Sequence, residues 1–150
     1  MLFIAHRGNV HGPDASENSP CHIDKALSAG YDAEVDVWLS DNNILYLGHD
    51  MPQYKIDAKF LEDRRHVLWC HAKNIHALKW LVENDFNTFF HDIDDYTLTS
   101  KGYIWAYPGK ELVEGSVCVM PERADDPLYL EKNKDIIYAV CSDYAPKFCK

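Results

Sequence analysis

Short apolar runs that end in polar or ionisable residues recur along the chain, and this pattern constrains the fold more than any other feature. Each run is rich in β-branched or aromatic residues and is bounded by turn formers, which is typical of a β-strand. The functional groups of an α/β barrel gather at the C-terminal ends of its strands, so the pattern predicts such a barrel. The eight runs cover residues 2–5, 33–39, 44–47, 67–70, 88–90, 103–107, 116–120 and 136–141.

Helices are expected to be fewer than such a barrel normally carries. Apolar residues at helical spacing predict one helix from Ser19-Pro20 to Gly30 and another after Asn74. Shorter helices are expected near 57–64 and 127–133. The length predicts that residues 1–150 form one domain. A complete barrel takes about 250 residues, so this domain is expected to be a shortened form. We expect the α/β class in the form of a minimal or partly open TIM-type β/α barrel, with several covering helices missing.

The missing helices would leave the outer faces of the later strands uncovered. Ile104, Cys118 and Met120 lie in these strands. Exposed apolar faces of this kind usually mark an interface between proteins. We therefore expect a homo-oligomer in which these three side chains are buried against a partner subunit.

Composition limits the partners and the compartment. The net charge of −9 disfavours nucleic acid, because a phosphate backbone needs a basic surface. The five cysteines are scattered and form no CxxC pair, which favours buried free thiols in a reducing compartment. No run approaches the roughly 18 apolar residues of a transmembrane helix, and the first residues lack the features of a secretory signal. We expect a cytoplasmic protein without a transmembrane segment.

Two carboxylates stand on one face of the second run. Glu34 and Asp36 alternate with Val35 and Val37, so the acids share one side of the strand and lie about 7 Å apart at Cα. Two carboxylates on an internal strand resist burial without a cation. The pattern predicts a site for a hard divalent ion, Mg²⁺ or Ca²⁺. The alternative is a solvated strand edge with one surface acid and one cap.

A turn after this strand is expected to bring a histidine to the two acids. The segment 40–43 is rich in turn formers. A hairpin centred near Asn42 would place His49 opposite Asp36. A histidine with a purely structural role is the alternative interpretation of His49.

Three further groups extend the candidate site. His6 and Arg7 follow the first run directly, and they offer a group that titrates near neutral pH and a guanidinium fork for phosphate. His71 and Lys73 share one face at the end of the fourth run, where they can add a metal ligand and a second cation. A strand end that points into solvent explains His71 and Lys73 equally well. Trp105 can line a pocket for the substrate, or it can simply fill the barrel.

Four segments in the first half of the chain resemble, in order and spacing, motifs of the glycerophosphodiester phosphodiesterase family: His6-Arg7-Gly8, Glu17-Asn18-Ser19, Glu34-Val35-Asp36-Val37 and Leu47-Gly48-His49-Asp50. The resemblance implies a phospholipase-C-like barrel that hydrolyses small phosphodiesters. It also implies that His6 and His49 are the general acid and base and that Arg7 binds phosphate. Glu34 and Asp36 would then bind the metal.

The resemblance also implies a role for Asn18 and exposes one departure. Asn18 would shape the loop over the site and contribute to substrate binding. The family usually has Glu-x-Lys at the fourth strand, whereas this chain has His71-Ala72-Lys73. A histidine ligand weakens a Ca²⁺ or Mg²⁺ site and suits Mn²⁺ or Zn²⁺ better.

The expected activity is metal-dependent phosphodiester hydrolysis by histidine acid–base catalysis. The nucleophile is either water or a neighbouring hydroxyl of the substrate, which would give a cyclic phosphate. One alternative is a catalytically weak or inactive barrel that acts as a ligand-binding or assembly module. Another alternative keeps the enzyme class but changes the substrate to a phosphoinositide or a phosphosugar polymer.

Overall fold

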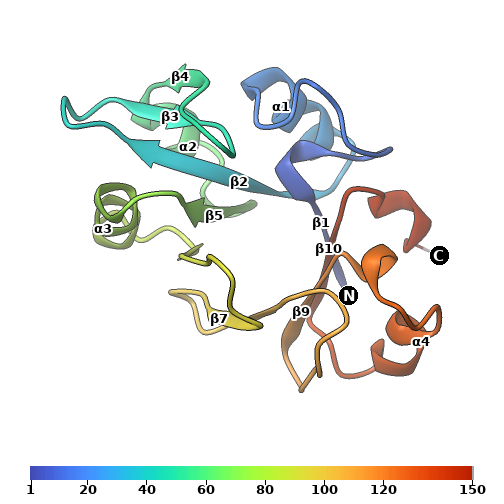
Figure 1. Ribbon diagram of the computed structural model, residues 1–150. Coiled ribbons are helices and arrows are strands. Elements are labelled where there is room, and N and C mark those ends of the chain that lie inside the picture. The colour runs from blue at the N-terminus through green and yellow to red at the C-terminus, as the bar shows by residue number, and fades with distance from the viewer. Residues whose placement is uncertain (150) are drawn as a thin grey trace.

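The computed structural model describes residues 1–149 and contains a single ten-stranded sheet with helices around its outside (Figure 1). The strands are β1 (Leu2–Ala5), β2 (Asp32–Leu39), β3 (Leu45–Leu47), β4 (Tyr54–Ile56), β5 (Leu68–Ala72), β6 (Thr88–Phe89), β7 (Tyr96–Leu98), β8 (Ile104–Ala106), β9 (Ser116–Val119) and β10 (Ala139–Ser142). The α-helices are α1 (Pro20–Ser28), α2 (Ala58–Glu62), α3 (Ile75–Glu83) and α4 (Tyr129–Asn133). Short 3₁₀ helices are η1 (His6–Gly8), η2 (Pro121–Arg123) and η3 (Ala145–Lys147).

The parallel part of the sheet curves in the order β6-β5-β2-β1-β10-β9-β8. The antiparallel strands β3 and β4 extend from β2, and β7 pairs with β8. Within residues 1–149, no strand pairing joins β6 to β8, so the sheet does not close. Phe89 and Trp105 stack across this seam with ring centroids 4.5 Å apart. The α/β class is confirmed, but the sheet is open and not a closed barrel.

The sequence predicts most elements and misses two strands. Each of the eight expected runs contains a strand, and each of the four expected helical segments contains a helix. The side chains of Ser19, Asp57 and Asn74 cap α1, α2 and α3 by accepting hydrogen bonds from backbone N–H groups. The unexpected strands β4 and β7 have only three residues each, so they are too short for a periodic pattern to reveal them.

The two faces of β2 separate the core from the candidate site. Val35 and Val37 are fully buried in the apolar cluster that includes Ile23 of α1 and Leu81 of α3. The residues that alternate with them on β2, Glu34 and Asp36 among them, face the interior of the curved sheet. The expected alternation is confirmed, and it fixes the direction in which the acids of β2 point.

The later strands are better covered than the sequence suggests. Cys118 is fully buried in a cluster that includes Tyr129 and Leu130 of α4, and Met120 is only 5% exposed. The prediction that Cys118 and Met120 need a partner subunit for burial is therefore wrong, because α4 and the interior of the sheet cover them. Ile104 is half-buried and lines a surface cavity with other side chains of the β7–β8 region.

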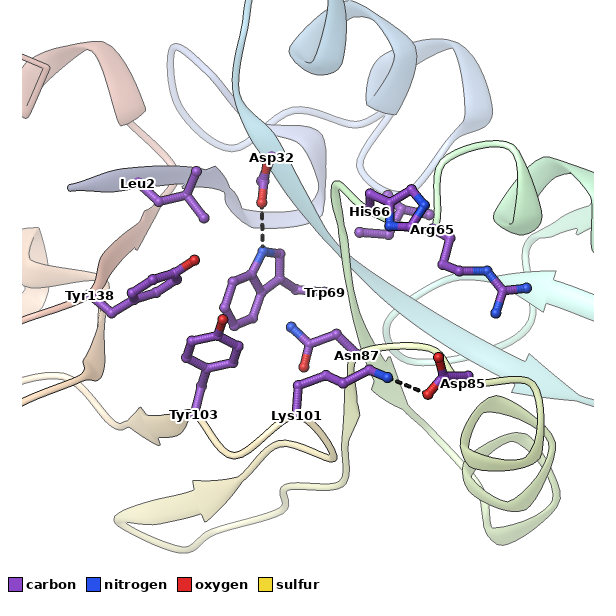
Figure 2. A pocket seen from close by; sticks show the side chains of 11 residues that line it. Leu2, Asp32, Arg65, His66, Trp69, Asp85, Asn87, Lys101, Tyr103 and Tyr138 are labelled. Atoms are coloured by element: carbon purple, nitrogen blue, oxygen red, sulfur yellow. Dashed lines mark hydrogen bonds and ion pairs between the residues drawn. The ribbon is translucent and has the colours of Figure 1, made fainter.

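Trp69, Tyr103 and Tyr138 form an aromatic cluster near the N-terminal ends of β5, β8 and β10 (Figure 2). The indole of Trp69 packs against Tyr103 and Tyr138 and donates a 2.9 Å hydrogen bond to Asp32. Burial raises the pKa of Asp32 above its usual value. The cluster borders a cavity of about 300 Å³.

All five thiols are free, and the expectation that they are buried is confirmed for three of them. Cys70, Cys118 and Cys141 are buried, whereas Cys21 and Cys149 are exposed. Burial raises the pKa of Cys70 and of Cys141, which makes these thiols poor nucleophiles. Among residues 1–149, no helix combines the length and the apolar character that crossing a bilayer requires.

Truncating a side chain in the outer apolar layer is expected to destabilise the protein strongly. Phe86 is fully buried and stacks on Trp80, and the guanidinium of Arg65 lies 4.6 Å from the centroid of its ring. Phe86→Ala should lower the free energy of unfolding by about 3–5 kcal/mol. Denaturant unfolding measures the change, and Phe90→Ala is the matched control because Phe90 is 49% exposed. Equal effects of the two substitutions would contradict this packing.

Candidate metal centre and phosphoryl site

The candidate site is a cavity of about 380 Å³ at the C-terminal ends of the strands. Its apolar lining comes from β6, β8, β9 and the residues that follow β8 and β9. Its polar lining comes from η1, β2, β5 and η2 and from the residues that follow β3, β5 and β6. The polar lining residues are His6, Arg7, Glu34, His49, His71, Lys73, His91, Asp92 and Arg123. The other lining residues are Phe89, Trp105, Tyr107, Pro108, Val119 and Met120.

Two acids and one imidazole meet beside this cavity, where Glu34 and His71 line it and Asp36 is fully buried. Residues Glu34, Asp36 and His71 each offer a ligand atom, and these atoms lie within 4.8 Å of one another. His71 Nδ1 is 3.1 Å from Asp36 Oδ1 and 3.8 Å from Glu34 Oε1. The register of β2 and β5 places Asp36 directly beside His71. The convergence expected from the sequence is present for these three residues.

The orientation of His71 favours a role as a ligand. Its Nε2 lies 3.0 Å from the backbone carbonyl of His91, which can only accept, so Nε2 carries a proton. Nδ1 faces the two acids, where a bound ion would take the place of the proton that it directs at Asp36. The ring also stacks on Phe89, with centroids 5.0 Å apart and planes 14° apart. A histidine whose outer nitrogen donates to a backbone carbonyl, as Nε2 of His71 does, is typical of metal ligands.

Asp36 is the most constrained acid in the site. Asn18 makes two hydrogen bonds with it, both at 2.9 Å. The side-chain amide N–H of Asn18 donates to Oδ2, and its side-chain carbonyl accepts from the backbone N–H of Asp36. Arg7 Nε lies 3.3 Å from Oδ2, and Lys73 Nζ lies 3.6 Å from Oδ1. Burial raises the pKa of Asp36, but contact with His71 and the charges of Lys73 and Arg7 outweigh it and hold the pKa well below its usual range.

The carboxylates of Asp36 and Glu34 are suited to bind an additional cation. Asp36 Oδ1 is buried, and it accepts no hydrogen bond of good geometry from the described residues. Glu34 is also buried, and its Oε2 accepts a 3.1 Å hydrogen bond from the backbone N–H of Arg7. Burial and the charge of Asp36 raise the pKa of Glu34 well above its usual range. A divalent cation between these acids would coordinate Oδ1 of Asp36 and compensate the buried charge.

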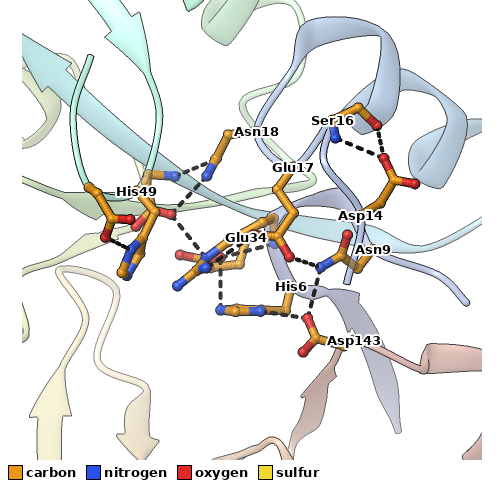
Figure 3. Close-up of polar contacts among 12 residues, drawn as sticks. His6, Asn9, Asp14, Ser16, Glu17, Asn18, Glu34, His49 and Asp143 are labelled. Atoms are coloured by element: carbon orange, nitrogen blue, oxygen red, sulfur yellow. Dashed lines mark hydrogen bonds and ion pairs between the residues drawn. The ribbon is translucent and has the colours of Figure 1, made fainter. Parts of the chain in front are cut away.

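His6 is held by an acid from the far end of the chain (Figure 3). Its Nδ1 lies 2.7 Å from Oδ1 of Asp143, which also accepts a 2.9 Å hydrogen bond from Asn9. Arg123 lies 3.3 Å from the other oxygen of Asp143. Burial raises the pKa of Asp143, but the contact with His6, together with Asn9 and Arg123, lowers it overall. Nε2 of His6 is therefore the nitrogen available to the cavity, 3.9 Å from Glu34 Oε2.

Strained backbone accompanies these side chains. Arg7, Asn18 and Met120 have φ values of 52°, 63° and 43°, in the left-handed region that residues other than glycine rarely adopt. Such strain is often concentrated at functional sites. Gly8 follows Arg7 with φ of 81°, and a Cβ there would approach the backbone of Ile23 to 3.2 Å. Glycine is thus required where η1 passes close to α1.

His49 lies in the cavity, but the expected pairing is wrong by one residue. Gly48, not His49, lies opposite Asp36 and donates a 3.1 Å hydrogen bond to its carbonyl. The turn closes through a Ser40–Ile44 hydrogen bond with Asn43 in the left-handed region, which sets this register. His49 Nδ1 instead lies 2.7 Å from the exposed Asp50. Its side chain is 39% exposed, far more than that of His6.

The remaining predicted residues divide between the cavity and its support. Trp105 and Lys73 line the cavity, as a role in substrate binding requires. Asn18 is only 1% exposed and does not line it, because its amide is engaged by Asp36. The sequence did not reveal the contact between His6 and Asp143. Asp143 lies two residues after the last apolar run, and this position is the one signal that the sequence offers.

No protein-family model matches the chain, and no curated protein is significantly similar to it.

Proposed function

We propose that the protein is a metal-dependent phosphoric diester hydrolase that acts on small glycerophosphodiester-like substrates. One observation carries the proposal: two buried acids and an oriented imidazole converge beside a His6–Asp143 pair and two cations. Glu34, His71, His6 and both cations line one cavity. The resemblance of the first half of the chain to glycerophosphodiester phosphodiesterases supports the same chemistry. The open sheet then represents a partly open form of the β/α barrel of that family.

The residues in and beside the cavity have two roles in phosphoryl transfer, to hold the ion and to bind the phosphoryl oxygens. Glu34, Asp36 and His71 would hold the divalent ion, which when bound supplies positive charge for the phosphoryl oxygens. Arg7 and Lys73 bind the other non-bridging oxygens and offset the charge that develops on them. Electrostatic stabilisation of this kind is usually the largest contribution to catalysis.

Proton transfer falls to the two histidines. His6 has a fixed orientation, because Asp143 holds its Nδ1 and leaves Nε2 in the cavity. His49 is more exposed and serves as the second acid–base group. One histidine removes the proton of the nucleophile, and the other protonates the leaving alkoxide. Water and a neighbouring hydroxyl of the substrate are both compatible nucleophiles.

Asp143→Asn tests whether Asp143 assists catalysis by orienting the ring of His6 and fixing its tautomer. The amide keeps the shape of the side chain but can donate to Nδ1, which favours the wrong tautomer of the ring. We expect kcat to fall roughly a hundredfold with little change in KM, and the pH at which activity appears should shift. The measurement is kcat and KM from pH 5 to 9. Unchanged kcat and an unchanged pH profile would show that the acid does not act through His6.

Hydrolysis of bis(p-nitrophenyl) phosphate tests the proposed function directly. The protein is stripped with a chelator and assayed alone and after addition of each of Mg²⁺, Ca²⁺, Mn²⁺ and Zn²⁺. Hydrolysis that requires an added ion supports the enzyme. Tight ion binding without hydrolysis of this probe or of glycerophosphodiesters supports the alternative, a binding or assembly module, and contradicts the enzyme.

We also propose a cytoplasmic homo-oligomer without a nucleic-acid partner. The net charge of −9 and the free thiols support this view. Exposed apolar side chains gather around β7, where Ile93, Leu98 and Val113 are 89%, 65% and 48% exposed. Light scattering that gives the mass of a single chain at micromolar concentration would contradict the oligomer.

A further inference from the structure

The identity of the ion is open in the proposed function, and the ligand atoms themselves discriminate between classes of ion. Two of the three atoms are carboxylate oxygens and the third is the nitrogen of His71. Ca²⁺ takes six to eight oxygen ligands, and Mg²⁺ demands octahedral oxygen ligands and keeps several waters. Imidazole nitrogen suits first-row transition ions instead.

His71 is fixed as a nitrogen donor by contacts on three sides. Nε2 is bonded to the carbonyl of His91, and the ring face is covered by Phe89. Nδ1 faces Asp36 at 3.1 Å. The ring cannot turn away from the acids without losing both the hydrogen bond and the stacking. Its nitrogen is therefore a permanent part of the ligand set.

The surroundings of the cluster supply few additional oxygen ligands. Glu17, the acid contributed by the loop before α1, uses its two oxygens on Arg7 and Asn9, at 3.1 and 2.7 Å. Asp143 is engaged by His6 and Arg123. Asp92 also lines the cavity, but it is not part of the group whose ligand atoms lie within 4.8 Å of one another. Side-chain oxygen ligands at that point come from Glu34 and Asp36, too few for the shell that Ca²⁺ prefers.

The two cations beside Asp36 weaken the site further for hard ions. Arg7 and Lys73 lie 3.3 and 3.6 Å from its oxygens and offset the negative charge of the acids. Binding of Mg²⁺ and Ca²⁺ depends mainly on that charge, because their bonds to oxygen are largely electrostatic. An ion that also bonds to imidazole nitrogen depends on it less.

We propose that this centre selects a first-row transition ion of the Mn²⁺ or Zn²⁺ type over Mg²⁺ and Ca²⁺, and that His71 sets the preference. The inference rests on the proposed function, because it concerns the same ion site. It replaces the Mg²⁺ or Ca²⁺ that the two acids alone suggest. Its consequence is that a single substitution at His71 should change which ions the protein prefers.

His71→Glu is the deciding variant, because it replaces the nitrogen by a third carboxylate at the same strand position. Isothermal titration of the full chain, stripped of metal, gives the Kd of each ion. We expect the ratio of the Mg²⁺ Kd to the Mn²⁺ Kd to fall at least about tenfold in His71→Glu. His76→Glu adds the same charge at an exposed position of α3 and should leave the ratio unchanged. An equal ratio in wild type and His71→Glu would overturn the proposal.

Electron spin-echo spectroscopy of the Mn²⁺-loaded wild type gives a second readout that needs neither turnover nor a folded variant. A bound imidazole couples its ¹⁴N nucleus to the electron spin of the ion, so we expect this coupling in the wild type. Its absence would overturn the proposal. If His71→Glu folds, the coupling should disappear in it. A coupling that persists there but is lost in His6→Ala would identify His6 as the nitrogen ligand and also overturn the proposal.

These readouts separate the inference from the proposed function. Nitrogen coupling and tight Mn²⁺ binding without phosphodiester hydrolysis would support the ion preference and contradict the proposed enzyme activity. Hydrolysis supported best by Mg²⁺ or Ca²⁺, without nitrogen coupling, would support the enzyme activity and contradict the ion preference.

Discussion

His6→Ala is expected to lower kcat for phosphodiester hydrolysis by about 10²–10⁴-fold, the range typical of a lost general acid or base. The imidazole is oriented by Asp143, and its Nε2 is the titratable nitrogen that this orientation leaves facing the cavity. Loss of the ring removes proton transfer but leaves the acids and cations that bind the phosphate. We therefore expect KM and ion affinity to change far less than kcat. Steady-state kinetics with an activated diester and titration of the ion measure the three quantities.

The matched control for His6→Ala is His76→Ala, which removes an exposed imidazole on α3. Thermal unfolding of both variants shows whether the fold is retained. Turnover by His6→Ala within a few-fold of the wild type would end the acid–base assignment of this residue. The exposed His49 would then be the stronger candidate for both proton transfers.

Asp36→Asn is expected to weaken binding of the ion by more than about 100-fold, and activity should fall with it. Losing a group that merely supports a metal ligand costs 10–100-fold in affinity, so loss of a charged ligand should cost more. The amide has nearly the shape of the carboxylate and can still accept the hydrogen bond from Asn18. The substitution removes the negative charge of Asp36, which lies beside Arg7 and Lys73. Titration of Mn²⁺ into the stripped variant measures the loss.

Asp32→Asn provides the control on the same strand. Asp32 lies at the opposite end of β2 and accepts a hydrogen bond from Trp69, which an amide oxygen can also accept. Its substitution should leave the Kd of the ion unchanged. Equal affinity in wild type and Asp36→Asn would show that the ion binds elsewhere, and the proposed catalytic centre would have no support.

The parts of the site that depend on local geometry follow from the sequence. Alternation along β2 and β5 places Glu34, Asp36 and His71 on the interior face, because side chains on a strand alternate wherever it lies in the sheet. The apolar partners Val35 and Val37 mark the opposite face. Helix ends are similarly local, since Ser19 and Asn74 each cap the helix that follows them.

The parts that depend on strand order do not follow from the sequence. Asp143 reaches His6 only because β10 pairs with β1, and no periodicity in a single sequence reveals that neighbour. The position of His49 depends on a left-handed residue in the turn, Asn43, which shifts the register by one residue. The cover that α4 gives to Cys118 is likewise a tertiary contact between segments that no short pattern connects.

The open seam between β6 and β8 has a consequence for the exchange of ligands with solvent. Stacking of Phe89 on Trp105 and hydrogen bonds between Thr88 and Ser100 bridge this seam in place of a strand ladder, and the ring of His71 lies on the same Phe89. These contacts are fewer than those of a continuous ladder, so fluctuations of the sheet should concentrate at this seam. Each such fluctuation would move Phe89 and, with it, the ring of His71. If His71 holds the proposed ion, opening of the seam would shorten the time for which the ion stays bound.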